Sequence, residues 1–173
     1  GAIFTKNKTY AEALREIRAH GQIKKYVHSR IGINGRLDTL QAAILLAKLE
    51  IFDYEIKLRN DIGKTYSDTI LSTYNNIMAP KILSNFKSVF AQYTIRVEKR
   101  EMLQNILEKH KVPNAIYYPK TLNKQSVFAE QRSSCYVAER IADEVISIPM
   151  HPYLEKEEIR TVLKALEDYN KNA

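Results

Sequence analysis

The chain has 173 residues, of which 45% are hydrophobic and 27% are charged, and its formal net charge is +7. This length fits one domain of ordinary size, or one and a fraction, and the composition is typical of a globular protein with a core of its own. No apolar run approaches the roughly 18 residues of a membrane span, and the N-terminus lacks the features of a signal peptide. We therefore expect a cytoplasmic protein that does not enter a membrane.

The net positive charge bears on the choice of partner, because basic chains often bind nucleic acid. Here the 27 Lys and Arg residues are spread along the sequence and interleaved with 20 acidic residues, without a block of five like charges. We therefore expect no dedicated nucleic-acid surface. The single cysteine, Cys135, excludes an internal disulfide framework, and we interpret it as an inert core thiol on the inner side of a helix. The four histidines lack metal-ligand spacing.

The N-terminal part of the chain mixes short elements with polar connections. Ala2 to Thr5 is an apolar run typical of a strand, and without the rest of a sheet it would present unpaired edges, for which we expect a partner chain or disorder. Asn7 is a good N-cap for the helix that follows, and Gly21 is its expected C-terminal stop. Gln22 to Gly35 is irregular and polar, which predicts a loop. The inner face of the helix is predicted to consist of Tyr10, Ala11, Leu14 and Ile17.

The stretch from Ile31 to Glu50 is the most informative part of the sequence. Two glycines and the polar residues Asn34 and Arg36 precede an apolar helix, which we expect to run to about Phe52 and to be buried on more than one side. Asp38 stands where it would cap this helix. From their types alone, Asn34 is a turn residue and Arg36 a surface charge at the helix entry. The helical stripe consists of Leu37, Leu40, Ile44, Ala47 and Ile51.

A second helix is predicted from Tyr54 to Leu71, after a bend near Phe52, and the two helices form a long strut. Their wide apolar stripe favours a dimer interface. The pattern then alternates between strands and helices, which predicts a small α/β domain with a short, mostly antiparallel sheet. The predicted strands are Val89–Val97, Ala115–Tyr118 and Val145–Ile148, and the predicted helices are Arg100–Lys111, Ser133–Asp143 and Glu155–Asn170.

Several of these stretches resemble one known family. GINGRLDTLQAA at residues 32–43, followed by a long Leu/Ala helix, resembles the signature of the DegT/DnrJ/StrS family of sugar aminotransferases, which use pyridoxal phosphate (PLP). The resemblance covers essentially all 173 residues, but only the C-terminal half of the family pattern. Further landmarks in the family's order are GAIFT at the start, His20-Gly21, Tyr117 to Pro119, LNKQ at residues 122–125 and SIPMHPYL at residues 147–154.

This resemblance implies an α/β fold that corresponds to the C-terminal part of a PLP-transferase. In the family, the lysine that forms the Schiff base with PLP lies a few residues upstream of a glycine-rich stretch, and this chain starts inside that stretch at Gly1. We therefore expect the lysine to be absent here, together with the acidic partner of the pyridine nitrogen. Lys6 and Lys8 lie on the other side of the motif, and we assign the catalytic role to neither. The chain on its own is expected to be inactive.

The resemblance also implies binding residues. The family positions that match Asn34 and Arg36 reach across the dimer into the neighbour's active site, the Asn to the PLP phosphate and the Arg toward the phosphates of the sugar nucleotide. Tyr117 and Tyr118 match a position near the substrate that commonly reads His-Tyr-Pro, and the replacement of the histidine leaves amphipathic packing as the alternative. Three other residues are interpreted as packing, solvent or turn groups, namely Tyr26, His28 and His151.

The predicted function is that of a C-terminal fragment of a PLP-dependent aminotransferase acting on a nucleotide-linked keto-sugar in surface polysaccharide biosynthesis. The sequence GRLDTLQAAILLAKLEIFDYEI at residues 35–56 resembles that of members which aminate UDP-2-acetamido-2-deoxy-3-oxo-glucuronate with glutamate as donor. A homodimer is also expected. The alternatives are a free-standing, non-catalytic dimerisation module and a basic nucleic-acid binder. The predicted regions are 1–36 as a remnant of the PLP-binding domain, 37–71 as interface helices and 72–173 as the small C-terminal domain.

Overall fold

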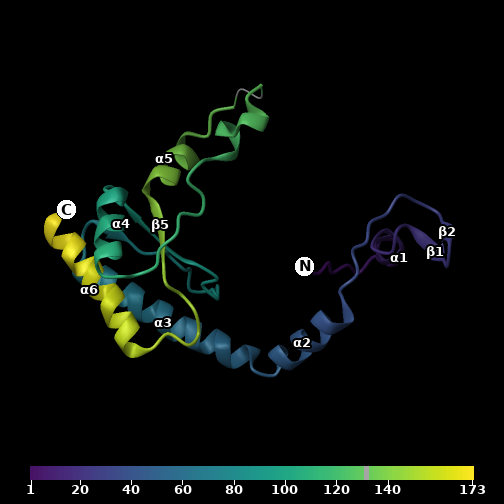
Figure 1. Ribbon diagram of the computed structural model, residues 1–173, viewed down its shortest axis with the longest axis horizontal. Coiled ribbons are helices and arrows are strands. Elements are labelled where there is room, and N and C mark those ends of the chain that lie inside the picture. The colour runs from purple at the N-terminus through teal and green to yellow at the C-terminus, as the bar shows by residue number, and fades with distance from the viewer. Residues whose placement is uncertain (131–132) are drawn as a thin grey trace. The chain divides into compact units, whose positions relative to one another are not determined.

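The computed structural model describes residues 1–130 and 133–173 and divides the chain into two compact units, Gly1–Ile51 and Phe52–Ala173 (Figure 1). Helices and small antiparallel sheets occur together, which confirms the predicted α/β class. None of the helices in the described ranges is long and apolar enough to cross a membrane. The finer division into residues 1–36, 37–71 and 72–173 stays a prediction.

The first unit consists of two helices and a short hairpin, and local capping sets where both helices begin. The side chain of Asn7 accepts a hydrogen bond from the N–H of Tyr10 at 3.1 Å, and the carboxylate of Asp38 accepts one from the N–H of Leu40 at 2.9 Å. Both predicted caps are therefore confirmed. The hairpin follows Gly21 (φ 74°) and lies in the segment predicted to be loop. The elements are α1 (Lys8–Ile17), β1 (Gln22–Lys24), β2 (Val27–His28) and α2 (Thr39–Leu49).

Three predictions for this unit are wrong. Ala2 to Thr5 forms no strand, because no other segment among residues 1–51 pairs with it, and Phe4 is 92% exposed. Tyr10 is exposed and does not belong to the inner face of α1. The helix α2 is not buried on more than one side, since Leu40 is 77% exposed and its other large apolar side chains are exposed too. A helix that is apolar all round needs covering surfaces, and its own unit supplies none.

The second unit is built around a three-stranded antiparallel sheet with strand order β3-β4-β5. Tyr93 lies opposite Ile148 in the register between β4 and β5. The break before the first helix of the unit falls between Leu49 and Phe52, close to the predicted bend. The elements are α3 (Phe52–Thr73), β3 (Ile77–Met78), β4 (Tyr93–Val97), α4 (Arg100–Lys109), η1 (Leu122–Lys124), η2 (Ser126–Phe128), α5 (Tyr136–Glu144), β5 (Val145–Ile148) and α6 (Lys156–Asn172).

The core of the second unit lies between this sheet and three helices. Along β4 the side chains alternate as predicted, with Tyr93, Ile95 and Val97 buried. The Tyr66 ring on α3 packs edge-on against Tyr93, with ring centroids 5.2 Å apart. The Tyr93 hydroxyl reaches Ser67 Oγ at 2.7 Å, so this polar group is paired inside the core. Other fully buried members are Ile70, Leu103, Leu107, Ile146, Leu166 and Tyr169.

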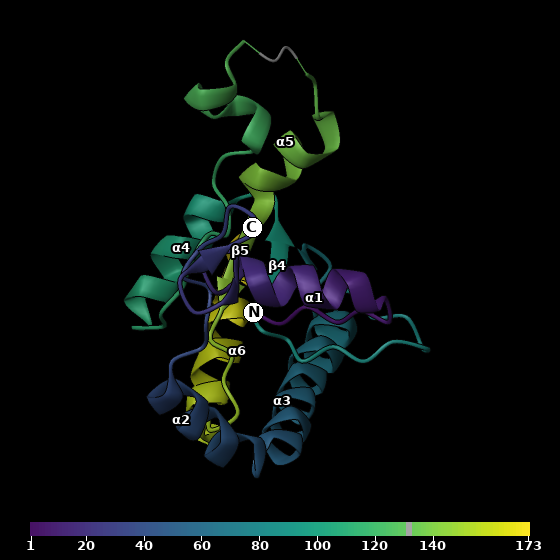
Figure 2. The same ribbon diagram turned by 90° about the vertical axis from the view of Figure 1, so that its right-hand side faces the viewer.

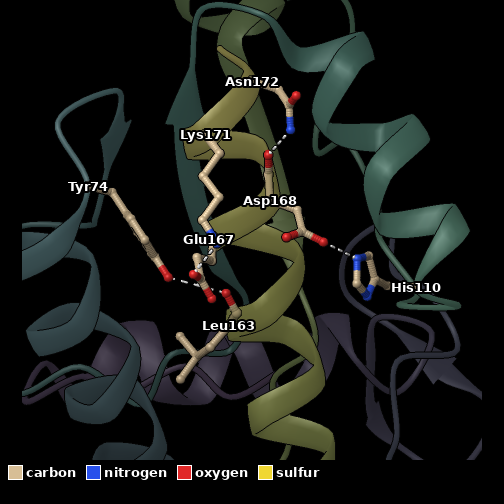
Figure 3. Close-up of polar contacts among 7 residues, drawn as sticks. All are labelled: Tyr74, His110, Leu163, Glu167, Asp168, Lys171 and Asn172. Carbon is tan, nitrogen blue, oxygen red and sulfur yellow. Dashed lines mark hydrogen bonds and ion pairs between the residues drawn. The ribbon is translucent and has the colours of Figure 1, made fainter.

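Hydrogen bonds along α6 connect it to the C-terminal ends of α3 and α4 (Figure 3). The Tyr74 hydroxyl, just beyond α3, donates to the backbone oxygen of Leu163 at 3.2 Å. On the other side of α6, Asp168 meets His110 Nε2, at the end of α4, at 2.8 Å. The helix begins with a capping box at Glu155, which agrees with the predicted start of the closing helix.

Three features of the second unit differ from the sequence predictions. The strand β4 begins only at Tyr93, because Phe90 has a φ of 42° and interrupts the extended backbone. Ala115 to Tyr118 is not a strand, and Ala115 makes a single bridge to Ser147. Cys135 is exposed rather than a core thiol, because α5 begins one residue later and leaves this residue at the helix entry.

Candidate functional site

The segment that carries Asn34 is fastened to the C-terminal end of α1 by backbone hydrogen bonds. Ile33 donates to the oxygen of Ile17 at 2.8 Å and accepts from the N–H of His20 at 3.0 Å, and Gly35 donates to the oxygen of Arg18 at 2.8 Å. These bonds flank Asn34 on both sides in sequence. The loop is therefore held in one conformation although no hydrophobic core lies beneath it.

Two glycines allow this close approach of backbones. A Cβ atom on Gly32 would lie 2.1 Å from the backbone nitrogen of Gly21, and one on Gly21 would lie 1.7 Å from the oxygen of Arg30. Gly21 also has a φ of 74°, a left-handed conformation that favours glycine. Both positions consequently require glycine. Gly21 is the glycine of the His20-Gly21 motif, so this motif reflects the close packing of the loop against α1.

Side-chain hydrogen bonds also hold the loop in place. Glu16 Oε2 accepts hydrogen bonds from Arg30 Nε at 2.6 Å and from Ser29 Oγ at 3.0 Å. His28 Nδ1 lies 2.8 Å from the backbone oxygen of His20 and ties the hairpin to the end of α1. Glu16 was not singled out from the sequence, because a glutamate in the middle of an amphipathic helix carries no signal of a loop contact.

Asn34 and Arg36 lie on this loop, and both side chains are exposed to solvent. The stretch that carries them is basic, because Glu16 is the single acidic residue between positions 15 and 36 and is paired with Arg30. An amide and a guanidinium in such a field suit the oxygens of a phosphate. The basic residues of this stretch are Arg15, Arg18, Lys24, Lys25, Arg30 and Arg36.

The two tyrosines belong to the second unit, where Tyr117 borders a pocket of about 360 Å³ at the end of β5. Tyr117 is 47% exposed and meets the ring of Tyr118 edge-on, with centroids 6.2 Å apart. Tyr118 is 77% exposed and is not part of the pocket wall. The wall is formed by Ala91, Gln92, Pro113, Asn114, Ala115, Tyr117, Ser147, Ile148, Pro149 and Met150.

Sequence reasoning missed the polar members of this pocket wall, Gln92 and Asn114, because neither lies in a recognisable motif. It also missed Arg59, which donates to the backbone oxygen of Phe90 at 3.1 Å and so holds the segment before β4. The prediction for His151 is confirmed, since its Nδ1 accepts a hydrogen bond from the N–H of Tyr153 at 3.2 Å within a turn.

The lysines with shifted pKa values are unsuited to Schiff-base chemistry. Lys57 and Lys171 have a pKa raised above the ordinary value, because each donates a hydrogen bond to a neighbouring carboxylate, Asp61 and Glu167 respectively. A lysine that forms a Schiff base needs the opposite, a lowered pKa. Across residues 1–130 and 133–173, no group of three His, Cys, Asp or Glu side chains is placed to hold a metal ion.

Comparison with known proteins gives a consistent result. UDP-2-acetamido-2-deoxy-3-oxo-D-glucuronate aminotransferase from Pseudomonas aeruginosa is 46% identical over 166 residues, which are 96% of this chain and 46% of that protein. The structure is similar to that of an aminotransferase from Brucella abortus, with a TM-score of 0.89, 32% identity and coverage of 96% of this chain and 45% of that one.

A second solved structure, S. venezuelae DesV in complex with a ketimine intermediate, has a TM-score of 0.91 at 27% identity over 98% of this chain and 46% of its own. The chain thus spans about half the length of the relatives that it matches. This agrees with the expected partial PLP-transferase fold. The model of the DegT/DnrJ/EryC1/StrS aminotransferase family matches residues 1–167, and the chain belongs to this family.

Proposed function

We propose that this chain is the C-terminal half of a PLP-dependent aminotransferase that transfers an amino group from glutamate to a nucleotide-linked keto-sugar, in the cytoplasm and for surface polysaccharide biosynthesis. The 46% identity to an aminotransferase of UDP-2-acetamido-2-deoxy-3-oxo-D-glucuronate supports that compound as the substrate. The observation that carries the proposal is the rigid, basic loop that exposes Asn34 and Arg36.

The donors on this loop fit one end of the cofactor. The Asn34 amide would hold the PLP phosphate, and the Arg36 guanidinium would pair with the phosphates of the sugar nucleotide, in each case in the site of the neighbouring subunit. PLP, when bound, supplies the electron sink for amino transfer. The chain's own part would be to bind and orient, and under this proposal the Schiff-base lysine would come from the N-terminal half of the enzyme. Tyr117 and Tyr118 would contact the substrate from the second unit.

The exposed surface of α2 supports a homodimer as part of this proposal. The exposed apolar side chains of α2 include Leu40 at 77%, Leu46 at 67% and Leu49 at 61% exposure. Large apolar side chains exposed to this extent on one helix support a protein interface. A loop that serves the neighbouring subunit lies naturally next to an interfacial helix, and Asp38, which caps α2, follows Arg36 closely in the sequence.

Reconstitution tests the proposal. The 173-residue chain is assayed with glutamate, PLP and the UDP-linked 3-keto sugar, first alone and then mixed with the N-terminal half of the Pseudomonas aeruginosa relative made as a separate polypeptide. We expect 2-oxoglutarate from the mixture only. Transamination by the chain alone would overturn the assignment of the lysine to another segment, and an inactive mixture whose two pieces associate would overturn the enzyme assignment.

The same mixture also tests the separate roles of the two loop residues. Asn34→Ala should weaken PLP binding by about ten- to a hundredfold, since one hydrogen bond to a charged phosphate is worth about 1.5–3 kcal/mol. Arg36→Lys should leave PLP affinity unchanged and raise the KM for the nucleotide sugar, because a lysine cannot reproduce the bidentate fork. Cofactor absorbance and initial rates measure the two effects, and equal losses in both variants would contradict the division of roles.

The exposed α2 surface favours one alternative, a free-standing module that dimerises without catalysis. In that case the chain alone would dimerise tightly, and adding the N-terminal half of the relative would produce neither association nor activity. Sedimentation of the chain with and without the second polypeptide decides between the two proposals.

A further inference from the structure

A second hollow in the Phe52–Ala173 unit lies apart from the pocket that Tyr117 borders. It has a volume of about 840 Å³ and lies between the C-terminal half of α3 and the segment 77–90 that follows it. Figure 2 shows this teal segment beside the helix. We call it the α3 groove. Its lining consists of Asn60, Lys64, Ser67, Leu71, Ile77, Met78, Ala79, Pro80, Lys81, Ile82, Phe86, Lys87, Ser88 and Phe90.

Large apolar side chains stand open to solvent along the groove. Leu71 is 76% exposed, Met78 is 60% exposed and Phe86 is 65% exposed, although the core of the unit begins close by at Ile70 and Ile77. Apolar patches of this kind on a folded unit mark ligand grooves or interaction surfaces. The volume lies within the usual range of small-molecule sites, about 300–1,000 Å³.

The charged residues of the lining are all cationic. Lys64, Lys81 and Lys87 line the groove, and the lining contains no aspartate or glutamate. All three lysines are exposed, and none takes part in the ion pairs found across the described ranges 1–130 and 133–173. Like charges around one hollow repel each other, so an anion placed there would be stabilised by all three.

The inner end of the groove is rigid. The Phe90 ring packs on Gly63 of α3, where an added Cβ would lie 2.5 Å from the ring. Phe90 adopts a φ of 42°, a costly conformation for a bulky residue, and its carbonyl oxygen is held by Arg59 at 3.1 Å while its N–H donates to Ser88 Oγ at 3.1 Å. The groove is therefore closed at one end by a wall that several contacts keep in place.

We propose that the α3 groove binds an amphipathic organic anion, a molecule with an apolar aromatic or acyl body and a carboxylate, sulfonate or phosphate group. The apolar lining would take the body, and Lys64, Lys81 and Lys87 would take the anionic group. Charge complementarity selects this occupant over a neutral apolar ligand or an uncharged helix of a partner. The proposal does not depend on the aminotransferase function, because the residues proposed to hold the cofactor and the sugar, Asn34, Arg36, Tyr117 and Tyr118, are not part of this lining.

The test uses 8-anilinonaphthalene-1-sulfonate as the anionic probe and N-phenyl-1-naphthylamine as its neutral counterpart, each titrated by fluorescence into the 173-residue chain. The triple variant Lys64→Gln, Lys81→Gln, Lys87→Gln should bind the sulfonate about tenfold more weakly and the neutral probe within about twofold of the original. The matched control carries Lys109→Gln, Lys156→Gln and Lys164→Gln, which change the net charge equally away from the groove and should leave both affinities unchanged.

Two further variants test whether the probe binds in the α3 groove or on α2. Phe86→Ser should weaken both probes, whereas Leu46→Ser on α2 should leave the lysine-dependent sulfonate binding intact. Equal losses in the two lysine triples would overturn the proposal, because the effect would then be one of net charge. Absence of lysine-dependent binding would also overturn it, whether the groove is covered by another part of the protein or by a second copy. Urea midpoints of all variants show that they remain folded.

Discussion

The two units of the chain keep their conformations by different means. In residues 1–51, all of which are described, no hydrophobic side chain is buried, and the loop that carries Asn34 is held by backbone hydrogen bonds, two close-packed glycines and an ion pair. The second unit has a cluster of buried residues that joins α3, the sheet, α4 and α6. A core gives stability to the whole unit, whereas backbone bonding gives only local definition.

Each unit therefore tolerates different substitutions. The first unit exposes large apolar side chains, and its shape is vulnerable at single backbone positions. The second unit is vulnerable through volume changes in its core. Substitutions in both units test this contrast, and their expected effects on stability decrease from the buried core to the exposed ion pair.

The largest effect is expected in the core of the second unit. Leu166→Ala on α6 should lower the free energy of unfolding by about 2–5 kcal/mol, because Leu166 is fully buried and the change leaves a cavity. Leu46→Ala on α2, where the side chain is 67% exposed, should change it by less than about 0.5 kcal/mol. Urea unfolding of the two variants measures both, and equal effects would show that α2 is buried in the free chain.

The next effect concerns the glycines beneath the Asn34 loop. Gly32→Ala should open the loop at a cost of about 1–3 kcal/mol, because the new Cβ would lie 2.1 Å from a backbone nitrogen. Gly35→Ala is the matched control, since its Cβ would meet a flexible Ile33 side chain atom at 3.2 Å. Hydrogen exchange of the Ile33 amide reports the opening, and similar exchange in both variants would contradict the proposed packing.

Alkaline pH should weaken the second unit. Burial raises the pKa of Tyr66 well above its ordinary value, so above about pH 10 the folded state binds more protons than the unfolded state. Stability is fully present below that pH and should fall by about 1.4 kcal/mol per pH unit as the pH rises further. Tyr66→Phe should reduce this slope, because it removes the titrating hydroxyl that donates to Pro149 at 3.2 Å. Unfolding midpoints between pH 9 and about 12 measure the slope, and an unchanged slope would assign it to other groups.

The smallest effect is expected for the ion pair of the first unit. Glu16→Gln should weaken the frame of the loop by about 0.2–1 kcal/mol, since the Glu16–Arg30 pair is partly exposed, with 21% and 45% of the side chains accessible. The change should be smaller at high salt, because exposed charges are screened. Exchange of the Ser29 amide at two salt concentrations measures it. A loss larger than that of Gly32→Ala would mean that the ion pair, rather than the close packing of the glycines, holds the loop.

Local signals in the sequence predicted much of the fold. The caps at Asn7 and Asp38 were predictable because capping involves residues only two or three positions apart. The helices α3, α4 and α6 were predictable from periodicity, since one face of each meets the core. The strand β5 was predictable as a short apolar run, and all four of its residues are buried. Asn34, Arg36, Tyr117 and Tyr118 came from the family resemblance, and their roles stay predictions.

Long-range packing decided the features that the sequence could not. Residues 2–5 have the composition of a strand, but a strand exists only with a partner to pair with. Cys135 and Tyr10 looked like inner residues, and their exposure depends on where neighbouring elements pass. The α3 groove likewise brings Lys64 together with residues from a segment with little regular structure. No periodicity in the sequence predicts this arrangement.

The sequence by itself determined the positions of most helices, the caps of α1 and α2, the family and the identity of the residues on the Asn34 loop, because these depend on neighbours along the chain. Only the tertiary structure decided that Gly21 and Gly32 meet, that Glu16 supports the loop and that cationic residues line an apolar groove. The physical reason is that such contacts join backbones and side chains distant in sequence, and their distances follow from packing rather than from residue type.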